Sequence, residues 1–361
     1  MIDQTKGMPL SISCPTPQSD DQIIRLGHGS GGRMTASLIE RIFLPAFDNA
    51  ILNRLDDAAQ CTITGGTMAM TTDSYVVSPI FFPGGDIGSL SVHGTVNDLA
   101  MSGARPLYLS ATFILEEGLA ISDLQKIVNS MSKACRECGV IVVAADTKVV
   151  NRGCADKLFI TTTGVGKIET LPAPGAHRAQ EGDCVIVSGD IGRHGVAVMS
   201  CREGLELETE IESDSFAMHN IVHSLLEKAT VHCLRDVTRG GLTGVLNELA
   251  QSSKVGIEID ESAVPIHPQV KGVCELLGLD PFYVACEGRL VAIVPEQYAQ
   301  KALESIRQEQ ERVFGNLPDF EQAQIIGRVV SSHPGRVILR SLVGGNRILD
   351  KLAGEQLPRI C

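Results

Sequence analysis

The amino-acid sequence predicts an α+β protein made of two α/β domains, with a polar segment at each end. At 361 residues the chain is longer than the roughly 250–300 residues at which single hydrophobic cores stop growing. Strand-like and helix-like segments alternate without a regular βαβ repeat, which favours α+β domains over a doubly wound sheet. The run Leu171-Pro-Ala-Pro-Gly175 separates two such series and is the best linker. The predicted divisions are a disordered tail (1–22), an N-terminal domain (23–170), a C-terminal domain (171–345) and a flexible tail (346–361).

The N-terminal domain is expected to begin with an amphipathic helix over residues 30–43 that ends near Pro45. A second amphipathic pattern predicts a helix over residues 122–138, with a capping box formed by Ser122 and Gln125 and a terminating Gly139. The remaining predicted elements are a helix at 86–101 and strands at 67–80, 107–115, 140–145 and 157–165.

The C-terminal domain continues the alternation of strands and helices. Its predicted strands are 184–188, 290–294, 325–330 and 336–339, and its predicted helices are 193–202, 216–229, 242–251 and 296–308. After Gly344-Gly345 the chain becomes a polar arm that ends in Leu357-Pro-Arg-Ile-Cys361. From Gly345 to Cys361 this arm reaches roughly 50 Å when it is extended at about 3.3 Å per residue.

The composition narrows the classes of partner. The chain has 43 acidic and 31 basic residues and a net charge of −12, which disfavours nucleic acid and anionic membranes because both require a basic face. With four tyrosines, ten phenylalanines and no tryptophan, it also lacks a base-stacking surface. No apolar run approaches the ~20 residues of a membrane helix, and the polar N-terminus does not have the pattern of a signal or transit peptide.

The eleven cysteines are scattered, which is untypical of a disulfide framework. The one close pair, Cys135-x-x-Cys138, falls on the apolar face of a predicted helix. Two buried small hydrophobes are the favoured interpretation, and a redox or zinc pair is the alternative. The predicted compartment is therefore reducing, which means the cytoplasm.

The segment Gly27-His-Gly-Ser-Gly-Gly32 satisfies the G-x-G-x-x-G pattern ahead of a predicted helix. It lacks the strong preceding strand of a dinucleotide fold, and no Gly-Lys-Ser/Thr follows, which excludes a P-loop. Two interpretations remain open. The N–H groups of Gly29, Gly31 and Gly32 bind an anion at the helix N-terminus, or the segment is a plain turn.

Several aspartates lie in apolar or glycine-rich surroundings, which is unusual for solvated side chains. They are Asp56, Asp57, Asp73, Asp98, Asp146 and Asp236. Each one alone is more often a cap or a turn residue. Because buried carboxylates need a counter-ion, and oxygen ligands together with phosphates suit Mg²⁺, the set beside a glycine-rich loop indicates a magnesium–nucleotide site.

These segments together resemble the HypE family of hydrogenase maturation factors, within the superfamily of aminoimidazole ribonucleotide synthetase and selenophosphate synthetase. The resemblance runs from about Ile23 to the end of the chain. Its motifs are Gly27–Gly32, Asp56–Ala59, Asp73, Phe81–Gly88, Gly94–Ala100, Asp146–Val150, Asp236–Gly241, Val273–Leu279, Glu287-Gly288 and Pro358-Arg-Ile-Cys361. The sequence departs from the family pattern at Ala145, where the family has Gly, and at Cys286 and Arg289, where it has Asn and Lys.

The resemblance implies two α/β domains of the aminoimidazole ribonucleotide synthetase type and an ATP-dependent carbamoyl dehydratase. A HypF-type carbamoyltransferase places a carboxamide on the thiol of Cys361. The protein dehydrates that group to a thiocyanate with ATP and Mg²⁺, and the cyanide passes to iron on a HypC–HypD complex for nickel–iron hydrogenase. The resemblance also implies a homodimer built by the N-terminal domains, with the site near its interface.

The site residues follow motif by motif. The nucleotide is assigned to Gly29, Gly31, Gly32, Asp57, Asp73, Asn97, Asp146, Thr147 and Asp236, and the metal to Asp56, Asp57, Asp73, Asp98, Asp146 and Asp236. Lys148 is expected to neutralise the transferring phosphate, and a surface ion pair is its alternative. Glu287 is expected to be a partly buried base with a raised pKa, and an exposed acid paired with Arg289 is its alternative.

Other functions stay open. From the bare sequence, Cys361 can be an accidental terminal thiol. A small-molecule ATP enzyme of the same fold, such as a selenophosphate synthetase or thiamine-phosphate kinase, is one rival, although the synthetase carries a Cys or Sec and a Lys in its glycine loop where this chain has only His28. A non-catalytic carrier that binds nucleotide to position its tail is the other.

Overall fold

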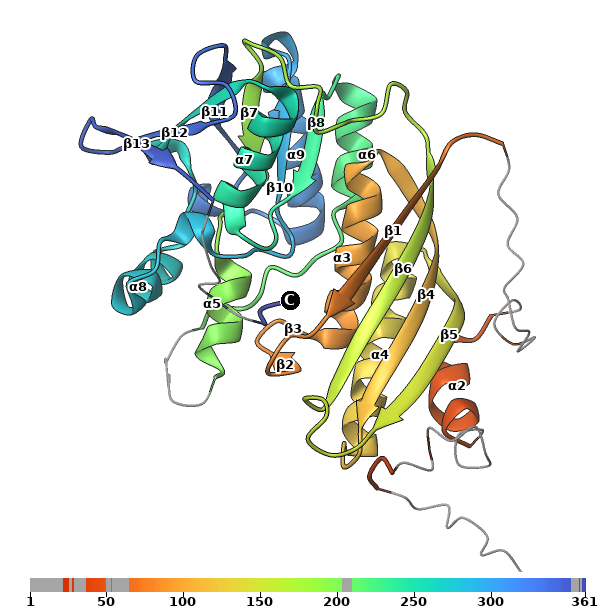
Figure 1. Cartoon of the computed structure of the whole chain (residues 1–361). Coiled ribbons are helices and arrows are strands. Elements are labelled where there is room, and N and C mark those ends of the chain that lie inside the picture. The colour runs from red at the N-terminus through yellow and green to blue at the C-terminus, as the bar shows by residue number, and fades with distance from the viewer. Residues whose placement is uncertain are drawn as a thin grey trace, which may run out of the picture.

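The computed structural model describes residues 22–25, 28, 37–49, 53, 65–202, 210–351, 357 and 359–361. Two sheets with their helices lie side by side, and α3 stands between them (Figure 1). Several predictions concern residues outside these ranges: the tail at 1–21, the first turns of the helix predicted at 30–43, and the site residues Gly29, Gly31, Gly32, Asp56 and Asp57.

The N-terminal domain is a four-stranded sheet in the order β1-β6-β4-β5, in which β4 and β5 are parallel and the other pairs antiparallel. Its strands are β1 (Met68–Tyr75), β6 (Leu158–Ile168), β4 (Ala104–Glu116) and β5 (Ile141–Val150). Helices α3 (Ile87–Met101) and α4 (Ile121–Cys138) pack on one face. Because residues alternate along a strand, the buried Ala111, Phe113 and Leu115 face these helices, and Thr112 faces away.

The first helix ends near Pro45, as predicted. There η2 (Ile39–Phe43) passes into α2 (Leu44–Phe47), which tolerates Pro45 in its first turn because a proline has no N–H to satisfy. The predicted capping box of α4 is wrong. Its N-cap is Ala120, without a side-chain bond, so Ser122 lies inside the helix, and the N–H of Ile121 binds the carbonyl of Gln22 at 2.9 Å. Gly139 ends α4 in a left-handed conformation, φ 67°, as predicted.

The C-terminal domain is a seven-stranded sheet in the order β13-β12-β9-β11-β7-β10-β8. Its strands are β7 (Cys184–Val187), β8 (Cys233–Asp236), β9 (Gly256–Asp260), β10 (Leu290–Val294), β11 (Gln324–Val330), β12 (Val337–Arg340) and β13 (Asn346–Leu349). Helices α6 (His219–Lys228) and α9 (Glu296–Phe314) cover one face and α7 (Gly241–Ser253) the other. Strand β13 lies within the segment that the sequence predicts as tail.

Shorter elements complete the architecture. They are β2 (Phe81–Phe82), β3 (Gly85–Asp86), α5 (Arg193–Ser200), α8 (Pro268–Leu277), η4 (Glu261–Ala263), η5 (Pro281–Tyr283) and η6 (Asp319–Glu321). Among the described residues, no helix is both long and apolar enough to cross a membrane.

Helix α3 joins the two domains. Its Val92 and Val96 belong to the core of the N-terminal domain, whereas Ala100 and Met101 belong to the cluster under α6. The amide of Asn97 is buried between the domains. Its Nδ2 donates to the carbonyl of Phe216 at 2.9 Å, and its Oδ1 accepts from the N–H of Met218 at 2.7 Å. The domains are therefore held together by both apolar packing and paired polar groups.

Candidate functional site

Four carboxylates from four parts of the chain converge where α3 meets the C-terminal domain. Asp73 lies near the end of β1, Asp98 in α3, Asp236 at the end of β8 and Glu287 just before β10. Burial raises the pKa of Glu287 well above its ordinary value, and the charges of Asp236 and then other nearby aspartates raise it further. Burial and the neighbouring Asp98 raise the pKa of Asp236 to about 7. The site is a concentration of negative charge with few compensating cations.

A cleft of about 570 Å³ opens at this cluster between the domains. Thr71 of β1 lines it and donates a hydrogen bond to Oδ2 of Asp98 at 2.8 Å. Arg235, which also lines it, forms a 2.8 Å ion pair with Glu248. The cleft is therefore lined by the carboxylates of Asp98, Asp236 and Glu248 together with the cations Arg235 and Arg239.

The donor set suits a hard divalent cation that shares its ligands with a nucleotide. Within the described ranges, no three His, Cys, Asp or Glu side chains are grouped closely enough to hold a metal by themselves. Mg²⁺ typically takes one or two carboxylates and completes its shell with waters and phosphates. Burial and then the charge of Asp98 raise the pKa of Asp236, and burial and then the charge of Asp73 raise the pKa of Asp98. Asp98 and Asp236, which both line the cleft, are therefore the residues that could hold such a shared ion.

Asp146 and Lys148 lie apart from this cluster. They are on β5, at the opposite edge of the sheet from β1, and Asp146 pairs with Thr112, which faces away from the helices. Their side chains share one face, as predicted, and form a 2.8 Å ion pair with exposed fractions of 57% and 64%. The hydrogen bond from Lys148 lowers the pKa of Asp146. Within one chain these residues, with the intervening Thr147, are not brought to the carboxylate cluster.

Glu287 is buried, with 3% of its surface exposed, and its Oε1 has no hydrogen-bond partner within the described part of the chain. The alternative of an exposed acid paired with Arg289 is wrong, because Arg289 binds Asp190 at 2.6 Å instead. The backbone of Glu287 is fixed on both sides: its N–H donates to Oδ1 of Asp214 at 3.1 Å, and its carbonyl accepts from Asn97 at 3.3 Å. The amide of Asn97, predicted to bind nucleotide, is thus engaged within the protein.

The end of the chain is seated between the domains (Figure 1). Ile360 is 4% exposed within the N-terminal core. The N–H of Val76 donates to the carbonyl of Cys361 at 3.2 Å, and Nη1 of Arg359 forms a 2.8 Å ion pair with Asp156. Val76 directly follows Tyr75, whose pKa is raised by burial and in part by the charge of Glu287. The last residue of the chain and the buried acid therefore lie in one region of the molecule.

The structure also settles the cysteine pattern. Cys135 and Cys138 are 5% and 6% exposed, and both thiols are free, which confirms the interpretation as buried hydrophobes. Burial raises the pKa of Cys135 to about 12. Cys286, where the sequence departs from the family pattern, is fully buried, and its Sγ accepts from the N–H of Gly192 at 3.1 Å. Ala145, the other departure, is exposed on β5.

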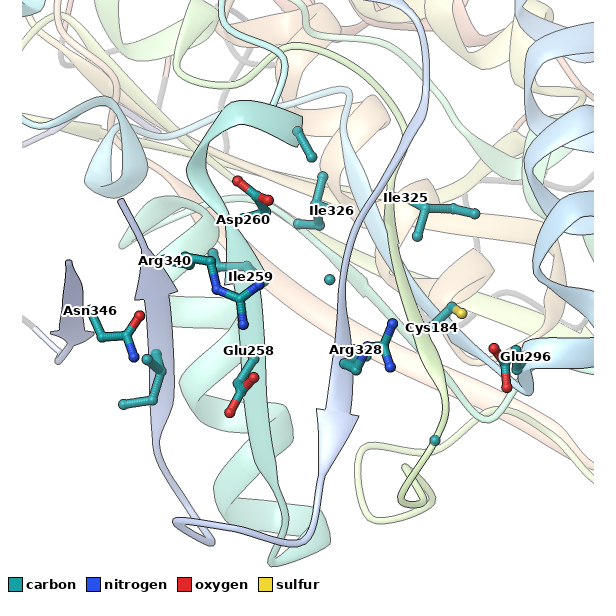
Figure 2. A pocket seen from close by; sticks show the side chains of 14 residues that line it. Cys184, Glu258, Ile259, Asp260, Glu296, Ile325, Ile326, Arg328, Arg340 and Asn346 are labelled. Atoms are coloured by element: carbon teal, nitrogen blue, oxygen red, sulfur yellow. The ribbon is translucent and has the colours of Figure 1, made fainter. Parts of the chain in front are cut away.

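A second hollow, of about 400 Å³, lies over β9, β11 and β12 of the C-terminal sheet, beside Glu296 at the start of α9 (Figure 2). Arg328 and Arg340 stand beside Glu258 and Asp260 on neighbouring strands. Since the opposite charges alternate across the strands, they compensate each other. None of the predicted site residues lines this hollow, so it offers no competing place for the nucleotide.

Sequence reasoning missed His194, which contacts the tail, Asp214, which contacts Glu287, and Ser213, which contacts His194. No motif marks them, and each acts through a backbone group or another side chain. Only the fold brings them to the site.

Comparison with known proteins identifies the family. Residues 55–168 match the AIR synthase related protein N-terminal domain, and residues 180–340 match the C-terminal domain of the same family. The chain is 50% identical to carbamoyl dehydratase HypE of Azotobacter vinelandii, over 94% of this chain and 97% of that protein. It is 43% identical to HypE of Escherichia coli, over 94% and 99%. The chain belongs to the HypE family of carbamoyl dehydratases.

Solved structures agree. A HypE hydrogenase maturation protein in complex with ATP superposes with a TM-score of 0.87 at 49% identity, covering 93% of this chain and 99% of that one. The HypE of a HypE–HypF complex superposes with a TM-score of 0.73 at 43% identity, covering 87% and 99%. A thiamine-monophosphate kinase at 21% identity, with a TM-score of 0.56, shares the fold. The predicted fold class and family are thus confirmed.

Proposed function

We propose that this protein uses ATP and Mg²⁺ to dehydrate a carboxamide carried on its own Cys361 to a thiocyanate, which supplies cyanide for nickel–iron hydrogenase. The observation that carries the proposal is that the end of the chain is seated between the domains, with the carbonyl of Cys361 bound by the N–H of Val76 and that of Ile360 bound by the buried His194. An accidental terminal cysteine has no reason to be placed there.

The reaction proceeds in two steps. The amide oxygen attacks the γ-phosphorus of ATP, ADP leaves, and one N–H proton is lost, which gives an O-phosphorylated imidate on sulfur. The second N–H proton then goes to a base, the C–O bond breaks, and phosphate departs as the C≡N bond forms. When bound, Mg²⁺ supplies charge neutralisation for the phosphoryl transfer. Asp73, Asp98 and Asp236 would hold the ion together with the nucleotide, and Glu287 accepts the N–H proton that the carboxamide loses in the first step.

Burial fits Glu287 for this role. A carboxylate that water solvates freely is too weak a base for a carboxamide N–H, whereas a buried carboxyl with a raised pKa holds the proton more strongly. Its Oε1, which has no hydrogen-bond partner among the described residues, is the oxygen available to the substrate.

We infer that two copies complete each site through the open face of the N-terminal sheet. Met68, Met70 and Ile141 of that sheet are 51%, 67% and 37% exposed, which is unusual for large apolar side chains on a strand. Asp146 and its neighbour Lys148 belong to the same domain but lie far from Asp73 within one chain. In a dimer, β5 of one copy reaches the cluster of the other.

Mixed dimers test this arrangement. Asp73→Asn and Asp146→Asn are each expected to abolish most ATP use. If each site takes Asp73 from one copy and Asp146 from the other, a mixed dimer of the two variants has one intact site of two. An equal mixture then recovers about a quarter of wild-type activity. Recovery at the level of the separate variants contradicts shared sites, and sedimentation of Met70→Glu, expected to be monomeric, checks the interface separately.

The partners follow from the carried group. A HypF-type carbamoyltransferase loads the thiol, in line with the relative solved as a HypE–HypF complex, and a HypC–HypD complex receives the cyanide. The arm beyond β13 moves the thiol between these partners and the site. All the steps take place in the cytoplasm, where the thiol stays reduced.

The deciding experiment is the intact mass of the C-terminal peptide after the transferase, carbamoyl donor and ATP are supplied. Wild type is expected to gain a carboxamide and then lose one water. Glu287→Gln should bind ATP and stop at the thiocarboxamide, Lys148→Ala should fail at ATP-dependent activation, and Cys361→Ser should gain nothing. A wild type that binds ATP and carries the carboxamide without losing water is a carrier, and transfer of phosphate to a free small molecule indicates a kinase.

A further inference from the structure

A short strap, residues 213–214, links the seated tail to Glu287. Asp214 is 8% exposed, and its Oδ1 accepts the N–H of Glu287 at 3.1 Å. The neighbouring Ser213 contacts His194 of α5, with 2.7 Å between Oγ and Nδ1. The strap is itself fixed, because the N–H of Ser213 donates to the carbonyl of Pro83 at 2.8 Å. Two adjacent residues therefore reach the acid on one side and the tail on the other.

His194 is the contact to the tail. It is fully buried, and its Nε2 lies 2.8 Å from the carbonyl oxygen of Ile360, the residue before Cys361. Phe82 packs edge-on against its ring at 5.3 Å between centroids. The imidazole is thus fixed both by packing and by hydrogen bonds.

The direction of each hydrogen bond in this chain follows from its ends. A carbonyl oxygen only accepts, so Nε2 of His194 carries the proton and donates to Ile360. Nδ1 then has a lone pair and accepts from the hydroxyl of Ser213. The Ser213 oxygen in turn accepts from the N–H of Ser215 at 3.1 Å. Both ring nitrogens of His194 and the hydroxyl of Ser213 thus have hydrogen-bond partners when the imidazole is neutral. Burial lowers the pKa of His194, which agrees with the neutral form.

We propose that His194 and Ser213 form a latch that seats the carrier end of the chain, and that Asp214 keeps the seated carboxamide aligned with Glu287. The three are positioning residues, since none of them reaches the reacting atoms directly. The latch rests on the function proposed above. The latch explains how a tail long enough to reach partner proteins returns to one geometry. Ser213 holds the ring of His194 in a fixed orientation, so the carbonyl of Ile360 always meets the same N–H donor.

The remaining tail contacts are of two kinds. Backbone hydrogen bonds run from the N–H of Val76 to the carbonyl of Cys361 and from the N–H of Ser78 to the carbonyl of Arg359, both at 3.2 Å. The side chain of Arg359 forms an ion pair with Asp156, and because these side chains are 39% and 43% exposed, solvent screens it. His194 is the buried donor to Ile360, and a buried acceptor left without its donor is costly. Loss of the latch is therefore expected to release the thiol more than loss of the exposed ion pair.

The experiment compares His194→Leu, His194→Gln and Ser213→Ala, each in the full chain with the tail intact. His194→Leu fills the space without a donor, whereas Gln places an amide donor near the Nε2 position. Ser305→Ala is the matched control, because it also removes a partly buried serine hydroxyl from a hydrogen bond. Its Oγ lies 3.1 Å from Oγ of Ser224 on α6. Circular dichroism and gel filtration establish that each variant is folded.

Two rates are measured. The first is alkylation of Cys361 by iodoacetamide without ATP, followed by peptide mass, and the second is loss of water from a tail already loaded with the carboxamide. His194→Leu is expected to raise the first about tenfold and lower the second at least tenfold, with loading by the transferase unchanged. Ser213→Ala should shift both in the same directions by less, and His194→Gln should restore part of each.

Alkylation of Cys361 at the wild-type rate in His194→Leu overturns the latch, even if dehydration falls. Equal effects of Ser305→Ala overturn it as well. If His194→Leu does not fold, Ser213→Ala decides by the same two rates. A wild type that never forms thiocyanate contradicts the proposed function, whereas protection of the thiol, which needs no chemistry, still tests the seating.

Discussion

Gly288→Ala places one methyl group between the strap and Glu287. An added Cβ at this position overlaps the carbonyl oxygen of Asp214, and it lies 3.0 Å from the carbonyl carbon of Asp214 and 3.2 Å from Cβ of Phe216. Carbon atoms in van der Waals contact are about 3.5–4.0 Å apart, and the overlapped carbonyl oxygen lies nearer than either carbon, so the strap has to move away by at least ~1 Å. Overpacking of this size costs about 1–3 kcal/mol of stability.

The larger effect is expected on the reaction. A displacement of about 1 Å in a catalytic arrangement costs on the order of 100-fold in rate, so the loaded tail of Gly288→Ala should lose water about 100-fold more slowly. The assay is peptide mass against time. Gly272→Ala is the matched control, because the added Cβ in α8 has nothing within 4 Å and alanine favours the helix. A wild-type rate in folded Gly288→Ala refutes the close packing of the strap.

Three further results are expected. The pKa of Asp236 is about 7 in the folded protein and about 3.9 in the unfolded chain, so its contribution to stability is present at low pH and lost as the pH rises through 7. Thermal unfolding in the presence of a chelator and without nucleotide should therefore show a melting temperature that falls over this pH range. In Asp236→Asn the melting temperature should depend less on pH. Native thiol labelling should modify the exposed Cys154 and spare Cys135, whose pKa burial raises to about 12. Asp156→Asn should weaken seating by no more than about 1 kcal/mol, seen as at most about fivefold faster alkylation of Cys361, since its pair with Arg359 is half exposed.

The sequence located most elements correctly where an element carries its own pattern. Strand β10, fully apolar, has the bounds that the sequence predicts. Strand β5 was predicted to end at residue 145 but continues to Val150, because β4 offers it a partner as far as Glu116. Strand β8, four residues of mixed polarity, exists through its pairing with β10 and has no period of its own to detect. Pairing across the sheet decides such elements, and the local sequence does not.

The site divides in the same manner. Carboxylates in apolar surroundings could be recognised from residue type, and Asp73, Asp98 and Asp236 do converge with Glu287. Their partition from Asp146 could not be predicted, because it depends on which edge of the sheet each strand occupies and which face each side chain points to. Alternation along a strand fixes the face only once the register is known.

The positioning residues, such as His194 and Asp214, could not be predicted from the sequence because they bind backbone groups. His194 binds the backbone carbonyl of Ile360. Because every residue type has a backbone carbonyl, nothing in the tail sequence indicates that this one binds a histidine. Asp214 likewise binds the backbone N–H of Glu287 rather than its side chain. Residues that touch the reacting group must have a particular chemistry and therefore leave a signature. Residues that hold the backbone in place need only a position, and the fold alone supplies that.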